Sequence, residues 1–136
     1  MQSDEVPKRV AEFLHGNVES YEELEILLLL HRERTQSWSA EALGARLRLS
    51  VPLTDAALSA LATRRLINAA SNPPGSSYTA VSANPAFDET IGCLANFYAS
   101  RPIEIIKLMS ANAIERVRTA ALRTFVEAFV LRKDKD

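Results

Sequence analysis

Few side chains in this 136-residue sequence are of the types that commonly do covalent or metal chemistry. The two histidines, His15 and His31, have no thiol or carboxylate at the spacing of a metal site, so we expect structural histidines and no bound metal. The single cysteine, Cys93, lies among apolar neighbours without a nearby base, which favours a small buried side chain over a nucleophile. The glutamates of residues 22–25 fall in the first turn of a predicted helix, where the helix dipole stabilises carboxylates.

Known catalytic patterns are also missing from the sequence. It contains no Ser–His–Asp order, no glycine-rich phosphate loop and no HExxH motif. We therefore expect a protein that is not an enzyme, with no cofactor.

A small set of cations is the clearest candidate for a binding function. Between residues 39 and 83 the chain carries four basic side chains and two acidic ones, a net charge of +2 on a chain whose overall charge is −1. The basic ones are Arg46, Arg48, Arg64 and Arg65. Cations attract phosphate groups, but this set is well short of a strongly basic surface.

Composition limits the other possibilities. Hydrophobic residues make up 47% of the chain, enough for a sizeable core. A lone cysteine gives no disulfide framework, and the N-terminal residues lack the apolar region of a secretory signal. The longest apolar run, residues 26–30, is too short to cross a bilayer. These features predict a cytoplasmic protein of one domain with a helical extension, and no membrane partner.

The N-terminal third of the chain has helical patterns. An amphipathic helix is predicted over residues 6–14, ending near Gly16. Ser20 and Glu23 match a capping box, in which the serine side chain accepts a hydrogen bond from the Glu23 amide and the glutamate side chain reaches back to the start of the helix. The helix that begins there runs to about residue 34, and its leucines point to nearly all sides, so we expect it to be the central helix of the core.

Two further helices and a hairpin follow. Ser39 caps a helix over 39–48, and Trp38 before it should be mostly buried against Leu43 as a hydrophobic staple. Val51 and Pro52 predict an extended step. The third helix is expected over 53–65, followed by strands at 66–70 and 77–81 around a turn rich in proline and glycine.

The remainder is predicted to be helical in three pieces. Residue 84 begins the first, Arg101 and Pro102 end it, and a shorter helix covers 103–109. Asn112 can cap a last helix over 112–131, in which Phe125 and Phe129 lie with other apolar residues on nearly every side.

This order of elements resembles the winged helix-turn-helix family. The matching motif is Ala42-Leu43-x-x-Leu47-x-Leu49-Ser50, then Ala57-Leu58-x-x-Leu61, then Leu66-Ile67, with the wing at Asn72–Ser76. The resemblance implies a mainly α fold with a small β-wing, organised as an N-terminal helix (1–19), a winged helix-turn-helix domain (20–83) and a C-terminal helical extension (84–136). The C-terminal half resembles helical tails of uncharacterised bacterial proteins, which imply no function.

In winged helix-turn-helix proteins the third helix lies in the major groove of DNA. Carried onto this sequence, the resemblance implies a DNA-binding set made of Arg46, Arg48, Thr54, Ser59, Thr63, Arg64, Arg65 and Asn72. Asp55 near the start of the helix would repel phosphate. The wing departs from the family pattern because it carries no lysine or arginine.

The apolar C-terminal helices suggest that two chains associate. We expect a homodimer whose seam includes Ile91, Tyr98, Leu122, Phe125, Val126 and Phe129. The leading interpretation is a bacterial-type transcriptional regulator that binds DNA as a dimer. One alternative is the same fold used as an adaptor for another protein, and another is a ligand-sensing domain with an apolar pocket.

Overall fold

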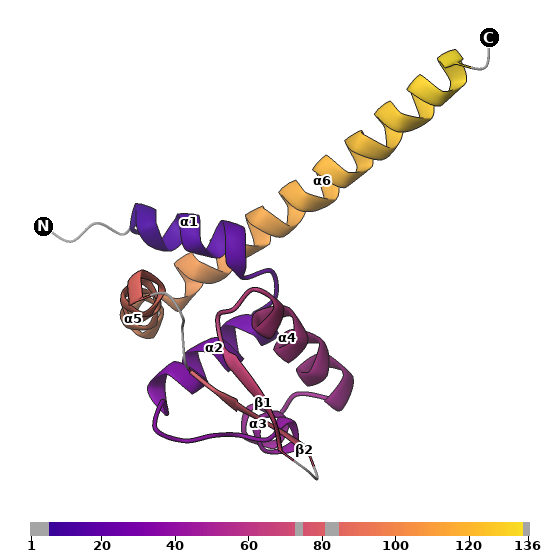
Figure 1. Ribbon diagram of the computed structural model, residues 1–136. Helices are drawn as coiled ribbons and strands as arrows, with labels where there is room; N and C mark the ends of the chain where they lie inside the picture. The colour runs from indigo at the N-terminus through magenta and orange to yellow at the C-terminus, as the bar shows by residue number, and fades with distance from the viewer. Residues whose placement is uncertain (1–5, 73–74, 81–84, 135–136) are drawn as a thin grey trace, which may run out of the picture.

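The computed structural model describes residues 6–72, 75–80 and 85–134, and the described part is mainly helical with a small antiparallel sheet (Figure 1). The elements in chain order are α1 (Lys8–Asn17), α2 (Tyr21–Arg32), α3 (Ala40–Leu47), α4 (Val51–Thr63), β1 (Asn68–Asn72), β2 (Gly75–Thr79), α5 (Pro85–Ser100) and α6 (Pro102–Asp134). This architecture confirms the predicted fold class. None of the helices in the described ranges is long and apolar enough to cross a membrane.

Serine side chains start three of the helices. Ser20 Oγ accepts a hydrogen bond from the Glu23 amide at 3.1 Å, and Ser39 Oγ accepts one from the Ala42 amide at 3.1 Å. Ser50 caps α4 in the same way by accepting from the Leu53 amide. α4 therefore begins at residue 51, two residues earlier than predicted, because a proline in the first helical turn has no hydrogen bond to lose.

α2 is the central helix, as predicted. Its apolar side chains from Leu24 to Leu30 are buried, and it contacts α3, α4 and α5. α1 packs across α5 and α6, with the rings of Phe13 and Phe87 in an edge-to-face contact at 5.6 Å between centroids.

α3 and α4 approach closely at a tight turn. Arg48 ends α3 in the left-handed conformation, with φ of 59°, and the Leu49 amide donates to the Gly44 carbonyl. A side chain at Gly44 would come within 3.1 Å of Thr54 Oγ1 and 3.2 Å of the Leu49 carbonyl oxygen. Glycine at this position therefore allows the two helices to cross.

The hairpin is tighter than predicted. β1 and β2 pair from Asn68↔Thr79 to Asn72↔Gly75, so the strands extend into the stretch predicted to be the loop. Leu66 and Ile67, predicted to be in the first strand, instead lie buried in the bend before it. The remaining loop residues, 73 and 74, and the predicted strand end at 81 lie outside the described residues.

α6 is one continuous helix, so the predicted break before Asn112 is wrong. No proline or glycine follows Pro102 to end the helix. Asn112 lies inside the continuous helix with its side chain only 6% exposed, so it does not cap a new helix. The N-terminal part of α6 packs on α1 and α5, whereas every described side chain from Val117 to Val130 is exposed. Figure 1 shows this C-terminal part extending away from the other elements.

Trp38 provides a test of how the hairpin is attached. Its side chain is partly buried against the core, and its backbone exchanges two hydrogen bonds with Tyr78, at 2.9 and 2.8 Å. We expect Trp38→Ala to lower the free energy of unfolding by about 3 kcal/mol, the lower end of the range for a core aromatic, because the ring is not fully buried. Urea unfolding of the two proteins measures this difference, and an unchanged midpoint would show that the ring adds nothing to the core.

Candidate nucleic-acid interface

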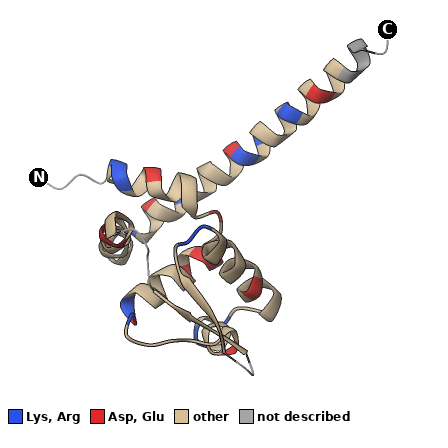
Figure 2. Cartoon of the chain, viewed as in Figure 1, with Lys and Arg blue, Asp and Glu red and all other residues tan. Residues whose placement is uncertain are grey.

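The surface that would face DNA consists of α4 and the elements on either side of it. α4 buries Thr54, Ala57, Leu58 and Leu61 against the core, so its opposite face points to solvent. The exposed side chains are Val51, Pro52, Leu53, Asp55, Ala56, Ser59 and Thr63. This outward face therefore carries a carboxylate and no cation, and Figure 2 shows α4 and the hairpin with almost no charged residues.

Thr54 does not belong to this surface, which corrects the sequence-based assignment. It is 1% exposed, and its hydroxyl donates to the Ser50 carbonyl at 2.8 Å. Thr54 also packs against Gly44 where α3 crosses α4. Its role is to hold the two helices together. Ser59 and Thr63 are exposed, and their contact with DNA stays a prediction.

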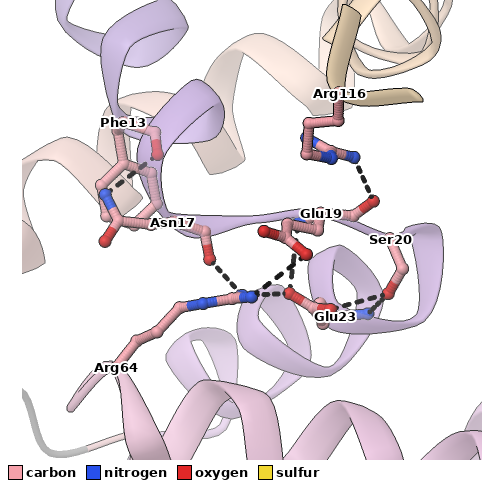
Figure 3. Close-up of polar contacts among 7 residues, drawn as sticks. All are labelled: Phe13, Asn17, Glu19, Ser20, Glu23, Arg64 and Arg116. Atoms are coloured by element: carbon pink, nitrogen blue, oxygen red, sulfur yellow. Dashed lines mark hydrogen bonds and ion pairs between the residues drawn. The ribbon is translucent and has the colours of Figure 1, made fainter. Parts of the chain in front are cut away.

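Arg64 is also removed from the DNA-facing set, because its guanidinium group is engaged inside the protein. It donates to the Asn17 carbonyl at 2.7 Å and forms ion pairs with Glu23 and, at 3.4 Å, with Glu19 (Figure 3). The side chains of Arg64 and Glu23 are only 24% and 8% exposed. We call Arg64, Glu23, Glu19 and the Asn17 carbonyl the Arg64 cluster; it ties the end of α4 to the segment between α1 and α2.

Glu23 was predicted from the sequence only as a helix-capping residue. Its carboxylate does accept from the Ser20 hydroxyl and from the Glu19 amide, at 3.2 and 3.1 Å. The same carboxylate also binds Arg64, 41 positions along the chain. The sequence pattern of a capping box covers only four residues and carries no information about a partner 41 residues away. The ion pair with Arg64 could therefore not be predicted from this pattern.

Arg46, Arg48 and Arg65 remain as exposed cations next to α4. Arg46 and Arg48 lie at the end of α3, directly before the turn into α4. Arg65 follows the end of α4 in a left-handed conformation, with φ of 60°. The three cations therefore lie next to the two ends of α4, and none lies within the helix. Asn72 ends β1, and its side chain is outside the described part of the structure.

The expected dimer seam is also changed by the structure. Ile91 is 2% exposed inside the core and cannot contact a second chain. Tyr98 is partly buried, and its hydroxyl donates to Glu25 at 3.0 Å. Burial and this hydrogen bond raise the pKa of Tyr98, so the hydroxyl stays protonated. The other four seam residues are exposed on α6: Leu122, Phe125, Val126 and Phe129.

The cysteine and the two histidines do not form a metal-binding cluster among the described residues. Cys93 packs partly buried against the core, and burial lowers the pKa of His31. His15 lies 3.8 Å from Glu115. In the part of the chain that the structure describes, no three histidine, cysteine or acidic side chains group as metal ligands would. The expectation that the protein is not an enzyme stays a prediction.

Comparison with solved structures gives close topological matches. HlyU of Vibrio cholerae aligns with 25% identity over 65% of this chain and 88% of HlyU, with a TM-score of 0.53. MepR of Staphylococcus aureus, solved in a DNA complex, aligns with 11% identity over 83% of this chain and 90% of MepR, at a TM-score of 0.54. YusO of Bacillus subtilis aligns with 13% identity over 82% and 83% of the two chains, at 0.51.

These alignments define the class of fold. The chain has the winged helix-turn-helix fold, as its sequence predicted, with α3 and α4 as the helix-turn-helix and β1–β2 as the wing. No model of a protein family and no curated protein sequence matches the chain.

Proposed function

We propose that this protein is a transcriptional regulator that binds duplex DNA without enzymatic activity, as a homodimer in the bacterial cytoplasm. The observation that carries the proposal is the order and packing of α2, α3, α4 and the hairpin. The same fold occurs in MepR, which is described as a transcription regulator of a multidrug efflux pump and has been solved with DNA. In such domains the helix equivalent to α4 enters the major groove.

The charge arrangement supports DNA binding of moderate strength. Arg46, Arg48 and Arg65 are exposed next to the two ends of α4, where they can reach phosphate groups beside a groove that α4 enters. Arg64 contributes little, because the Arg64 cluster holds it inside the protein. The sequence suggested four phosphate contacts per subunit, and the structure leaves three.

The dependence of DNA binding on salt tests this count. Each neutralised phosphate lowers the logarithm of the binding constant by about 0.9 per decade of salt, so three arginines on each subunit predict a slope of about −5. Fluorescence anisotropy with sheared genomic DNA over a KCl series measures the slope. Arg65→Ala should reduce its magnitude by about 2, because a dimer loses two contacts.

Arg64→Ala is the matched control for Arg65→Ala. If Arg64 is structural, this variant keeps the slope of the wild type at temperatures where it remains folded. Absence of any DNA affinity at low salt would contradict the proposal and would favour the adaptor function instead.

A further inference from the structure

The start of α4 presents exposed apolar side chains. Val51 is 65% exposed and Leu53 is 48% exposed, and Pro52 between them is also exposed. We call these three residues the apolar tip. Apolar side chains are more stable when they are removed from water, and those of the apolar tip are not buried in the core of their own chain.

A carboxylate lies one helical turn further along. Asp55 follows Val51 by four positions, which places the two side chains on the same side of α4. Both line a shallow hollow between α3 and α4 together with Leu49. Asp55 is exposed, and no described cation is paired with it. The start of α4 thus combines exposed apolar side chains with one carboxylate.

Equally informative is what α4 lacks. Its sequence, VPLTDAALSALAT, contains no arginine, lysine, asparagine or glutamine. Arginine and lysine are the side chains that recognise guanine in the major groove, and asparagine and glutamine are those that recognise adenine. Recognition of purines by these side chains is therefore not available to α4.

The chemistry of the surface fits pyrimidines. Thymine displays a C5-methyl group in the major groove, which apolar side chains contact, and cytosine displays an amino group, which a carboxylate accepts. Guanine displays two acceptors there, and these would repel Asp55. We propose that the apolar tip contacts thymine methyl groups and that Asp55 accepts a hydrogen bond from a cytosine amino group. This inference rests on the proposed function of DNA binding.

The distribution of charge favours DNA over a protein as the partner of this surface. Arg46 and Arg48 precede the start of α4 and Arg65 follows its end, while the only charged side chain on the exposed face of α4 is Asp55. A DNA groove has the complementary arrangement, with phosphates along both edges and base edges between them. The first turn of a recognition helix is also the part that approaches the bases.

Two pools of random-sequence duplex DNA test the methyl contacts. One pool contains thymine, and the other contains uracil, which pairs in the same way but lacks the C5-methyl group. The full-length protein should bind DNA selected from the uracil pool more weakly than DNA selected from the thymine pool. The expected difference is about fourfold for each contacted methyl group, the factor for removing one buried methyl group. Val51→Ser should reduce this difference between the thymine pool and the uracil pool. Arg65→Ala should weaken binding to both pools equally.

Selection from the thymine pool tests Asp55. Wild-type protein should enrich a C·G pair at one position of each half-site, Asp55→Ala should lose that preference, and Asp55→Asn should shift it toward adenine. Equal affinity for the two pools, or selected sequences unchanged by Asp55→Ala, would overturn the inference while leaving DNA binding in place. Failure to bind either pool at low salt would overturn the proposed function together with it.

Discussion

Replacing Glu23 with alanine should lower the melting temperature by roughly 10 °C. The Glu23 carboxylate is almost fully buried, accepts hydrogen bonds from the Ser20 hydroxyl and the Glu19 amide, and pairs with Arg64. Removing Glu23 takes away the buried partner of Arg64 and leaves only the exposed Glu19 and the Asn17 carbonyl, at a cost of about 3 kcal/mol. For a chain of this size each kcal/mol of lost stability lowers the melting temperature by about 3 °C. Thermal unfolding followed by circular dichroism measures the change.

Glu19→Ala is the matched control, because it removes the other carboxylate of the Arg64 cluster. The Glu19 side chain is 52% exposed, and an exposed ion pair contributes less than about 1 kcal/mol. Its melting temperature should therefore change by only about 3 °C or less. A Glu23→Ala protein as stable as the Glu19→Ala protein would show that the buried pair does not stabilise the fold.

Placing glutamates at Phe125 and Phe129 should separate the proposed dimer into monomers. Both rings are more than half exposed on the extended part of α6, with Leu122, Val126 and Val130 exposed nearby. A monomer rarely leaves so much apolar surface in water. If each of the two positions contributes about 2 kcal/mol, counted over both chains of the dimer, the double variant raises the dissociation constant by about 1,000-fold. Sedimentation velocity over a concentration series measures this change.

Arg123→Glu provides the control for charge. It changes the charge of α6 by the same amount as the double phenylalanine variant but lies, by helical geometry, about 160° around the helix from Phe125 and about 120° from Phe129. This variant should remain dimeric. A wild-type protein that sediments as a monomer at micromolar concentration, or a double variant that still dimerises, would rule out α6 as the seam.

Local signals in the sequence were sufficient for most of the fold. Ser20 and Ser39 mark helix starts through hydrogen bonds within one turn, so their effect can be predicted without knowing the rest of the structure. The break expected at Asn112 was wrong because a capping residue ends nothing when the chain before it can continue as a helix. A buried position for Asn112 depends on packing between distant elements, which one sequence does not reveal.

The candidate interface was less predictable than the fold. Exposed and buried positions on α4 depend on where the helix begins, and the sequence suggested a start two residues late, which concealed the apolar tip. Arg64 and Arg65 are neighbours with the same side chain, yet one is held inside the protein and the other is exposed. The groups that hold Arg64, which are Glu23, Glu19 and the Asn17 carbonyl, come from a distant part of the chain, so a local sequence pattern does not distinguish the two arginines.

The uninterrupted course of α6 has a consequence for the spacing of any operator that a dimer would recognise. Its 33 residues extend about 50 Å as a single rod, joined to the winged-helix part of the chain where Arg116 donates to the Glu19 carbonyl. If α6 forms the seam at residues 122–129, the number of residues between Arg116 and the seam would set the separation and the relative rotation of the two copies of α4. One added residue would turn the seam by about 100° about the helix axis, whereas seven would lengthen the rod by about 10 Å and nearly restore its phase. In such a dimer, the length of α6 between Arg116 and the seam would set the spacing between half-sites.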